Sequence, residues 1–356
     1  MQSAESFINQ VWYGPRGPHH WLLMFCLLPL SLLFYCVVKL RLYAYSSGLF
    51  KMSDSAVPTV VIGNITVGGT GKTPLAIALA VALKQAGLNV GVVSRGYGTN
   101  ANTIKYPLIV ESDGDATICG DEPLLIKRNT GAHVIVDPVR SRGAAMLLSS
   151  FQCDVVLCDD GLQHYALGRQ LELGVIDAAR QFGNRLPLPV GPLREPISRL
   201  RKCHYVILNE GTQVPPVDNE IYSDENDSNE LNRDRLFSMS LQTTVLVNIT
   251  TGETIKVNQL NASTVHAVAG IGNPGRFFAT LKQLGLELIE HPKPDHYVLQ
   301  EQELDFGDSY PVIMTEKDAI KLRHTTSTNL WYLPVQANLP DVFVKRLLVD
   351  IKSLIK

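Results

Sequence analysis

Short apolar runs alternate with helical patterns over most of this chain of 356 residues. Runs that lie between polar turns predict buried parallel strands, because strands covered on both faces read as nearly continuous hydrophobic stretches. Helical patterns at residues 74–85 and 139–149 fit between such runs. The alternation predicts an α/β fold built on a parallel sheet, with strands at residues 90–94, 133–137, 154–159, 173–177 and 205–209.

A polar and mostly acidic stretch at residues 218–235 interrupts this pattern and predicts a solvated loop. Strand-like runs follow, and a second α/β pattern begins near residue 265. We therefore predict a P-loop NTPase-like domain with a parallel sheet, joined to a second, smaller α/β domain. The predicted boundaries are 1–50 for an N-terminal membrane helix with its flanks, 51–235 for the first domain, 236–260 for a two-stranded linker, and 261–356 for the smaller domain.

Residues 21–38 form an apolar run of 18 residues without a charge. A helix rises about 1.5 Å per residue, so this run nearly crosses a hydrocarbon core. It is long for a signal peptide and lacks the polar stripe of a buried soluble helix. Lys39, Arg41 and Lys51 follow it and predict that the rest of the chain faces the cytosol. The sequence predicts a membrane anchor, and both a spanning helix and a shallow insertion fit the pattern.

Residues 57–74 read VPTVVIGNITVGGTGKTP: a strand, a glycine-rich turn, and a Lys-Thr pair that opens a helix. Backbone N–H groups of such a turn and the positive end of the helix dipole bind phosphates. Lys72 is suited to the β- and γ-phosphates, and the Thr73 hydroxyl to Mg²⁺. The general pattern G-x-x-x-x-G-K-[ST] is missed at its first position, where Thr66 stands. The segment nevertheless predicts a nucleoside triphosphate site.

Asp159 follows an apolar strand about 90 residues after the glycine-rich turn, and Asp160 comes next. A carboxylate at the end of such a strand is the Walker B arrangement, which binds the Mg²⁺ beside the loop. We predict that one of the two contacts the metal directly and the other acts through water. The sequence leaves open which one does so.

Composition narrows the class of protein. A formal net charge of −2 argues against a binder that neutralises nucleic-acid phosphates. The six cysteines include no C-x-x-C pair, which argues against a zinc site. The chain also lacks the N-K-x-D guanine motif of GTPases, and Val67 stands where partitioning ATPases carry a lysine. These differences disfavour an ATP-driven switch, although they leave it open as an alternative to a kinase.

A kinase needs a base for the acceptor hydroxyl and cations for the phosphoryl charge. The carboxylates of GDEP, a predicted turn at residues 120–123, and His296 in PDHY are candidates for the base. Tyr97 lies in a predicted glycine-rich turn after the second strand, where a tyrosine that packs on the fold and one that stacks on a ligand ring both fit the pattern. Arginines near predicted strand ends, Arg140 and Arg194, are candidate phosphate contacts.

Taken together, these motifs resemble the tetraacyldisaccharide 4′-kinase family of the Gram-negative lipid A pathway. The resemblance covers nearly the whole chain in order. It rests on GNITVGGTGKTP at 63–74, VVSRGYG at 92–98, GDEP at 120–123, DDGLQH at 159–164, LPVGPLREP at 188–196, AGIGNPGRFF at 269–278, PDHY at 294–297 and TEKDAIKL at 315–322.

The resemblance implies transfer of the ATP γ-phosphate to the 4′-hydroxyl of tetraacyldisaccharide 1-phosphate, which gives lipid IVA. It implies that Asp121 takes the hydroxyl proton, His296 orients Asp121, and Lys72 binds the phosphates. It implies no obligatory protein partner and a location at the cytoplasmic face of the inner membrane. The alternative is a membrane-associated ATPase switch that acts on a protein partner. The implied ATP-binding residues are Thr66, Val67, Gly68, Gly69, Thr70, Gly71, Lys72 and Thr73, and the implied Mg²⁺ ligands are Thr73, Asp159, Asp160 and Glu195.

Overall fold

The computed structural model describes residues 4–15, 17–96, 104–211, 233–322 and 325–355. The chain forms two compact units, each assembled from separate stretches of sequence. Unit 1 comprises Met1–Lys72, Cys153–Met239 and Leu339–Lys356, and unit 2 comprises Thr73–Gln152 and Ser240–Asn338. Tyr97, Gly98 and most of the acidic stretch at 218–235 lie outside the described residues.

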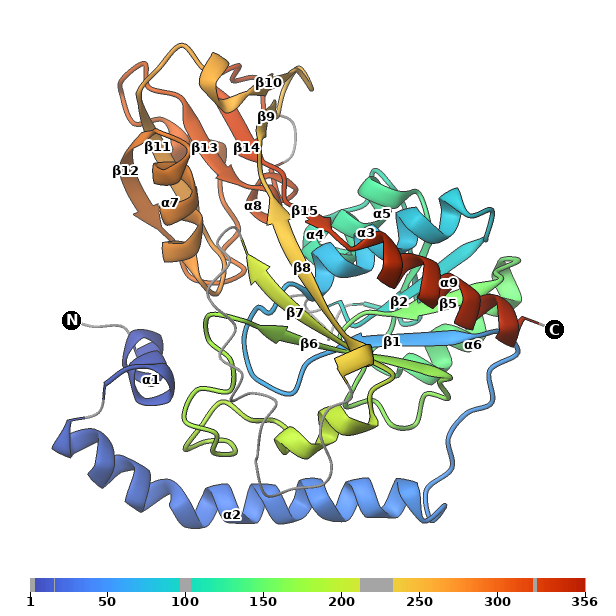
Figure 1. Ribbon diagram of the computed structural model, residues 1–356. Helices are drawn as coiled ribbons and strands as arrows, with labels where there is room; N and C mark the ends of the chain where they lie inside the picture. The colour runs from blue at the N-terminus through green and yellow to red at the C-terminus, as the bar shows by residue number, and fades with distance from the viewer. Residues whose placement is uncertain (1–3, 16, 97–103, 212–232, 323–324, 356) are drawn as a thin grey trace. The chain divides into compact units, whose positions relative to one another are not determined.

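Four parallel strands of unit 1 lie side by side in the order β7-β6-β1-β5 (Figure 1). Their apolar residues are almost fully buried, as expected of a sheet covered on both faces. Helix α9 packs on this sheet, where the Phe343 ring meets the Tyr205 ring edge-on at 5.5 Å. The elements of unit 1 are α1 (Ala4–Tyr13), α2 (Pro18–Ser46), β1 (Thr59–Gly63), β5 (Val155–Cys158), β6 (Leu171–Asp177), η1 (Ile197–Lys202), β7 (Tyr205–Gly211), η3 (Arg233–Arg235) and α9 (Asp341–Leu354), with β8 (Leu236–Gln242) at the boundary of the two units.

Two groups of strands make up unit 2. In the first, β2 and β4 run parallel, β3 pairs antiparallel with β4, and helix α6 packs on β2 and β4. The second group is a six-stranded sheet of order β10-β9-β14-β13-β11-β12, in which the four strands β14, β13, β11 and β12 are parallel. Helix α7 packs against β11 and β12 of this sheet.

The helices of unit 2 are α3 (Lys72–Gln85, which begins at the boundary), α4 (Ala116–Cys119), α5 (Asp121–Thr130), α6 (Arg140–Ser150), η4 (Val257–Gln259), α7 (Pro274–Gln283), η5 (Glu301–Leu304) and α8 (Glu316–Ala319). Its strands are β2 (Val90–Ser94), β3 (Leu108–Val110), β4 (His133–Val136), β9 (Val245–Asn248), β10 (Thr254–Lys256), β11 (Thr264–Ala269), β12 (Glu287–Pro292), β13 (Val312–Thr315), β14 (Leu330–Leu333) and β15 (Gln336–Asn338).

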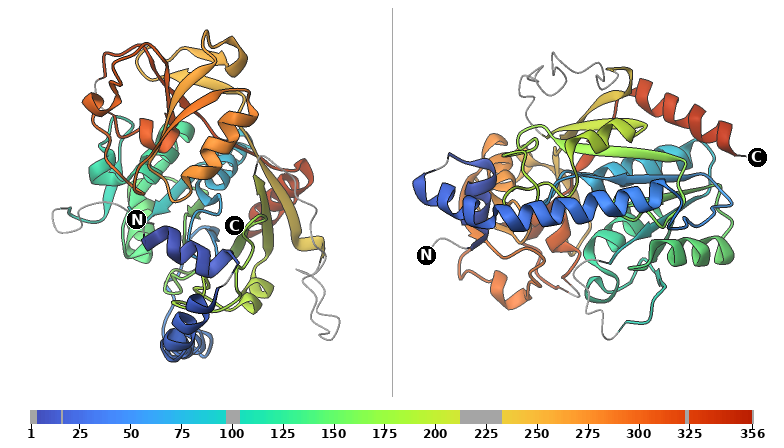
Figure 2. Two further views of the ribbon diagram at one scale, coloured as in Figure 1. Left: turned by 90° about the vertical axis from the view of Figure 1, so that its left-hand side faces the viewer. Right: turned by 90° about the horizontal axis from the view of Figure 1, so that it is seen from below.

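The long helix α2 lies along unit 1 and is held there by one face (Figures 1 and 2). Met24 of α2 packs with Val11 of α1 and with Val190 in a small apolar cluster. Further along the helix, the Ser31 hydroxyl donates to the Pro187 carbonyl at 2.7 Å. The opposite face carries exposed apolar side chains, among them Trp21, Leu22, Phe25, Leu32, Leu33 and Leu40.

The predicted α/β class is confirmed, and the predicted strands and helices appear close to their expected bounds. The GDEP segment differs from the prediction. It was expected in a turn, but Gly120 precedes α5 with φ +91°, and Asp121 opens that helix. The strands within residues 236–257 pair with different partners. Strand β8 pairs with β15 and strand β9 pairs with β10, so β8 and β9 do not pair with each other.

Candidate active site

The glycine-rich loop connects β1 to α3 in the strand–loop–helix order that the sequence predicts. Two of its glycines have backbone angles that favour this residue type, with φ of +105° at Gly68 and +89° at Gly71. A Cβ at Gly69 would meet nothing within 4 Å, and one at Gly68 only the Arg180 Nη1 at 3.5 Å. The loop therefore leaves open space beside its backbone, where phosphate oxygens have room to approach the N–H groups.

Lys72 is held beside the loop by two acceptors. Its Nζ lies 3.2 Å from Asn64 Oδ1 and 3.5 Å from Asp160 Oδ1. Asp160 stands just after β5 with φ +49°, and its other oxygen lies 3.5 Å from Arg194 Nη1. One carboxylate thus lies close to both the loop lysine and an arginine, two cations of the kind that stabilises phosphate charge.

The donors around the loop fit a nucleotide with Mg²⁺. The buried Thr70 hydroxyl has no hydrogen-bond partner among the described residues. Asp159, Asp160 and the Thr73 hydroxyl offer the hard oxygen ligands that Mg²⁺ prefers. Within the described part of the chain no three His, Cys, Asp or Glu side chains gather as a metal site. A Mg²⁺ ion shared with nucleotide phosphates needs only one or two protein carboxylates.

The PLREP segment is attached directly to the loop. Val67 N donates to the Pro192 carbonyl at 2.9 Å, and Arg194 N donates to the Ile65 carbonyl at 2.7 Å. These bonds fix the position of Arg194, whose side chain remains partly exposed.

Glu195 is engaged differently from what was expected of a metal ligand. Its side chain is buried; Oε1 accepts a short hydrogen bond from the Tyr165 hydroxyl, and Oε2 pairs with Arg199 Nε at 3.2 Å. Arg199 in turn pairs with Glu172, so Glu195 belongs to a buried ion network. These contacts support a structural role for Glu195. They do not support the prediction that Glu195 binds Mg²⁺.

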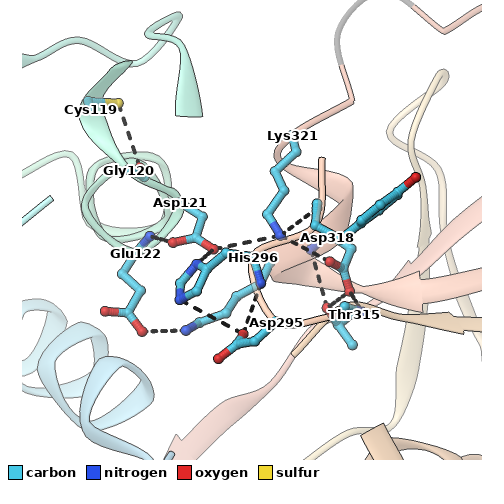
Figure 3. Close-up of polar contacts among 12 residues, drawn as sticks. Cys119, Gly120, Asp121, Glu122, Asp295, His296, Thr315, Asp318 and Lys321 are labelled. Carbon is cyan, nitrogen blue, oxygen red and sulfur yellow. Dashed lines mark hydrogen bonds and ion pairs between the residues drawn. The ribbon is translucent and has the colours of Figure 1, made fainter. Parts of the chain in front are cut away.

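Asp121 and His296 lie side by side in unit 2, although they are far apart in sequence (Figure 3). His296 Nδ1 is 3.0 Å from Asp121 Oδ2, while Asp121 Oδ1 accepts the backbone N–H of Glu122 at 2.9 Å. His296 has φ +58° and follows β12; its N–H donates to the Gly270 carbonyl at 3.2 Å and to Asp295 Oδ1 at 3.0 Å. The structure thus brings these two predicted residues together in a fixed geometry.

The environment of this pair separates the two pKa values. Burial by itself would raise the pKa of Asp121, but the hydrogen bond from His296 and the charges of Lys317 and Lys321 lower it to about 2. The hydrogen bond with Asp121 raises the pKa of His296; burial opposes this, and the charges of Asp121 and Asp295 reinforce it. Asp121 is 4% exposed, whereas the His296 side chain is 22% exposed. Of the two, His296 is the better proton acceptor and the more accessible one.

Three residues that sequence reasoning missed organise the loop. Asn64 accepts from Lys72, Gln163 Nε2 donates to the Asn64 carbonyl at 2.9 Å, and Asn209 Nδ2 donates to the Thr70 carbonyl at 2.9 Å. Asn64 and Gln163 lie inside the motifs GNIT and DDGLQH, which could have identified them. For Asn209 the only signal is a polar residue near the end of an apolar strand, a position that often faces a ligand in α/β folds.

Arg140, the other candidate phosphate contact, is 1% exposed. Its Nη1 donates to the Asp137 carbonyl at 2.9 Å, while the neighbouring Arg142 is the one that pairs with the Asp137 carboxylate. These contacts hold the Arg140 side chain inside unit 2. They do not support the predicted contact of Arg140 with a phosphate.

Comparisons with known proteins agree with this geometry. A family model described as tetraacyldisaccharide-1-P 4′-kinase, LpxK, matches residues 23–352. A protein named tetraacyldisaccharide 4′-kinase from Nitrosococcus oceani is 43% identical over 96% of this chain and 94% of its own length. A protein of the same name from Coxiella burnetii strain RSA 331 is 44% identical over 93% of this chain and 91% of its own length.

A solved structure extends the match to the fold. The crystal structure described as the "apo" form of LpxK from Aquifex aeolicus in complex with ATP superposes with a TM-score of 0.74 at 28% identity. The match covers 92% of this chain and 99% of the Aquifex chain. With the family model matching most of its length and relatives above 40% identity, this chain belongs to the tetraacyldisaccharide 4′-kinase family.

Proposed function

We propose that this protein transfers the γ-phosphate of ATP to the 4′-hydroxyl of tetraacyldisaccharide 1-phosphate and so forms lipid IVA, a step of lipid A biosynthesis. The names of its relatives and its family membership support this activity. They do not favour the alternative, a membrane ATPase switch that acts on a protein partner.

The Asp121–His296 pair is the observation that carries the proposal. A switch that only hydrolyses ATP has no need of an acceptor hydroxyl, whereas a kinase needs a group that removes the hydroxyl proton. A chain with a phosphate loop and a carboxylate–imidazole pair has the parts that phosphoryl transfer to an alcohol requires.

We propose that His296 Nε2 accepts the proton of the acceptor hydroxyl and that Asp121 orients the imidazole. These roles are the reverse of those that the resemblance implies. A carboxyl group with a pKa of about 2 is a weak base near neutral pH. A carboxylate that holds Nδ1–H fixes the imidazole tautomer and leaves Nε2 to accept a proton. The raised pKa of His296 strengthens it as an acceptor.

For the nucleotide, residues 66–73 would bind the ATP phosphates, with Lys72 on the β- and γ-phosphates. Asp159, Asp160 and Thr73 would hold Mg²⁺, which neutralises phosphate charge when bound. Thr70, whose buried hydroxyl has no partner in the described residues, supports this assignment. The contacts of Glu195 with Tyr165 and Arg199 leave it out of the metal ligands that we propose.

The N-terminal helix supports a membrane location. By length and composition α2 could cross a bilayer, but its buried residues His20, Met24, Ser31 and Ala44 recur along its whole length. If α2 spanned the membrane in this conformation, the polar backbone around Pro187 would lie in hydrocarbon at high cost. We therefore favour a helix that lies in the interface of the cytoplasmic leaflet.

The position of the basic residues agrees with that leaflet. Lys39, Arg41 and Lys51 are exposed at or beyond the C-terminal half of α2. Clusters of basic residues next to an apolar helix are attracted to anionic lipids. The substrate would then remain among the lipids while its sugar reaches the enzyme.

The division into residues 1–50, 51–235, 236–260 and 261–356 also remains a proposal. The two compact units are assembled from separate stretches of the chain and do not follow these boundaries. Expression of residues 261–356 alone, with its unfolding followed by circular dichroism, would test whether this part folds independently.

The proposed activity is tested by incubating purified protein with labelled Mg-ATP and tetraacyldisaccharide 1-phosphate in detergent micelles. We expect labelled lipid IVA from the wild type and none from Lys72→Ala. The Lys282→Ala variant serves as a control, because Lys282 is an exposed lysine of unit 2 paired with Glu290. ATP hydrolysis without labelled lipid would refute the kinase and favour the switch.

A further inference from the structure

A second pair of buried charges lies directly behind the Asp121–His296 pair (Figure 3). Lys321 is 4% exposed along its side chain, and its Nζ is surrounded by three oxygens. These are Asp318 Oδ1 at 3.1 Å, the Tyr297 carbonyl at 3.1 Å and Asp121 Oδ2 at 3.8 Å. One ammonium group therefore contacts both the carboxylate that orients His296 and the backbone of the residue that follows His296.

Asp318 fixes this ammonium group. It is completely buried, and its Oδ2 accepts the Gly270 N–H at 2.9 Å and the Thr315 hydroxyl at 2.6 Å. Gly270 follows β11 and, through its carbonyl, accepts the N–H of His296. Asp318 thus ties together the ends of β11 and β13, and holds Lys321 one helical turn further along the chain.

The charges show why such a pair is useful to the reaction. A buried carboxylate is costly unless a positive charge or several donors accompany it. When His296 is neutral, as a base must be, it no longer supplies that positive charge to Asp121. The Lys321 ammonium group is a second positive charge close to Asp121, so Asp121 can stay ionised while His296 gains and loses a proton.

We propose that Lys321 and Asp318 are positioning residues, which keep Asp121 ionised and oriented toward His296 and thereby set the pH at which His296 can act. This inference rests on the proposed function, because it assumes that His296 accepts the hydroxyl proton. It gives the TEKDAIKL motif a role that sequence reasoning did not assign.

Other charged groups also face His296 and affect its protonation. Asp295 Oδ1 lies 3.8 Å from His296 Nε2, and Lys317 from α8 opposes protonation of the imidazole. Lys317 is itself paired with Glu122 of α5. Removing the Lys321 ammonium group leaves an excess of negative charge around His296 and favours its protonated form. Removing the Asp318 carboxylate leaves an excess of positive charge and favours the neutral form of His296.

The test uses two variants of the full chain that change charge with little change in shape, Lys321→Met and Asp318→Asn. The first readout is the imidazole titration of His296, followed by NMR with labelled histidine and assigned through His296→Gln. We expect the titration of Lys321→Met to move to higher pH and that of Asp318→Asn to lower pH. Lys321→Arg keeps the charge, and its titration should return toward that of the wild type.

The second readout is kcat against pH in the micelle assay. The acid limb should move in the same two directions, with kcat at neutral pH at least about tenfold lower for Lys321→Met, while KM for ATP stays within about twofold. Lys282→Met, which breaks the exposed pair with Glu290 in the same unit, should change neither readout. Thermal unfolding establishes that each variant is folded, and Asp318→Asn tests the inference by itself if Lys321→Met does not fold.

The two readouts separate two kinds of failure. If the His296 titration is the same in the wild type and both charge variants, Lys321 and Asp318 do not set its protonation and the inference is refuted. If the titrations move as expected but the wild type labels no lipid, the electrostatic inference holds and the proposed function fails.

Discussion

Gly71 in the phosphate loop offers a quantitative test of how the loop is held. Its φ is +89°, and a Cβ built on it would lie 2.4 Å from Asn209 Nδ2 and 3.1 Å from Met239 Cε. Asn209 is 1% exposed and donates to the Thr70 carbonyl, so its amide has little freedom to retreat. In Gly71→Ala either the loop or Asn209 must move.

Two costs contribute to the effect. A side chain in this backbone region costs about 1–3 kcal/mol, and displacing a buried amide from its hydrogen bond costs about 1–3 kcal/mol. Because one movement of the loop would reduce both costs, we expect a total cost of roughly 2–4 kcal/mol, less than their sum. If ATP binding must restore the original loop, affinity for Mg-ATP falls by about 30-fold to about 1,000-fold.

The assay is equilibrium binding of a fluorescent ATP analogue to the wild type, Gly71→Ala, Asn209→Ala and the double variant. Removing the Asn209 amide relieves the collision but leaves the backbone cost, so the double variant should regain at least about 1 kcal/mol over simple additivity. Gly87→Ala is the matched control, since φ is +86° there but a Cβ meets nothing within 4 Å. It should lower the free energy of unfolding and leave ATP affinity unchanged.

Two results would refute this reasoning. Binding of ATP by Gly71→Ala within about twofold of the wild type would mean that the loop does not depend on this backbone geometry. Strict additivity in the double variant would mean that Asn209 does not restrict the residue at position 71. In either case the loop would be held by other contacts.

Three further predictions concern the proposed base, the buried ion network and the membrane face. Because Asp121 raises the pKa of His296, and because the neutral imidazole is the active form, Asp121→Asn should shift the acid limb of kcat to lower pH and reduce kcat at neutral pH by about 100-fold or more. If the acid limb of kcat does not move, a group other than His296 accepts the hydroxyl proton. Glu195→Gln should destabilise the fold by about 1–3 kcal/mol in thermal or urea unfolding, since it removes one of the two carboxylates that pair with buried Arg199 and leaves only Glu172; unchanged stability with a weaker Mg²⁺ dependence would instead make Glu195 a metal ligand. Phe25→Glu, on the exposed face of α2, should weaken binding to anionic vesicles in flotation without lowering stability in detergent, and wild-type binding would argue that this face does not meet the membrane.

Much of the fold could be predicted from local patterns. The strand before the loop, the loop itself and the helix after it are contiguous, and each has its own signature in composition and spacing. The apolar run at residues 21–38 likewise predicts a helix that avoids water. Such features depend on neighbours within a few residues, so the chain specifies them without reference to distant segments.

The partners of Glu195 and α2 could not be predicted in this way. Glu195 has the chemistry of a metal ligand, but only the folded chain shows that Tyr165 and Arg199 already occupy its oxygens. Similarly, hydrophobicity alone does not distinguish a spanning helix from one that lies along the protein. The folded chain adds the contacts of Met24 and Ser31, which hold one face of α2 against unit 1 and depend on where residues 186–190 pack.

The sequence by itself determined the α/β class, the phosphate loop with Lys72, and the apolar N-terminal helix, because periodicity and short motifs encode them locally. The association of Asp121 with His296, 175 residues away, was implied only by the family resemblance, and the tertiary structure alone shows their contact and the position of Lys321 behind them. Their contact depends on a helix N-terminus, a strand end and a turn with positive φ being brought together. It is set by strand order and packing, which no local pattern specifies.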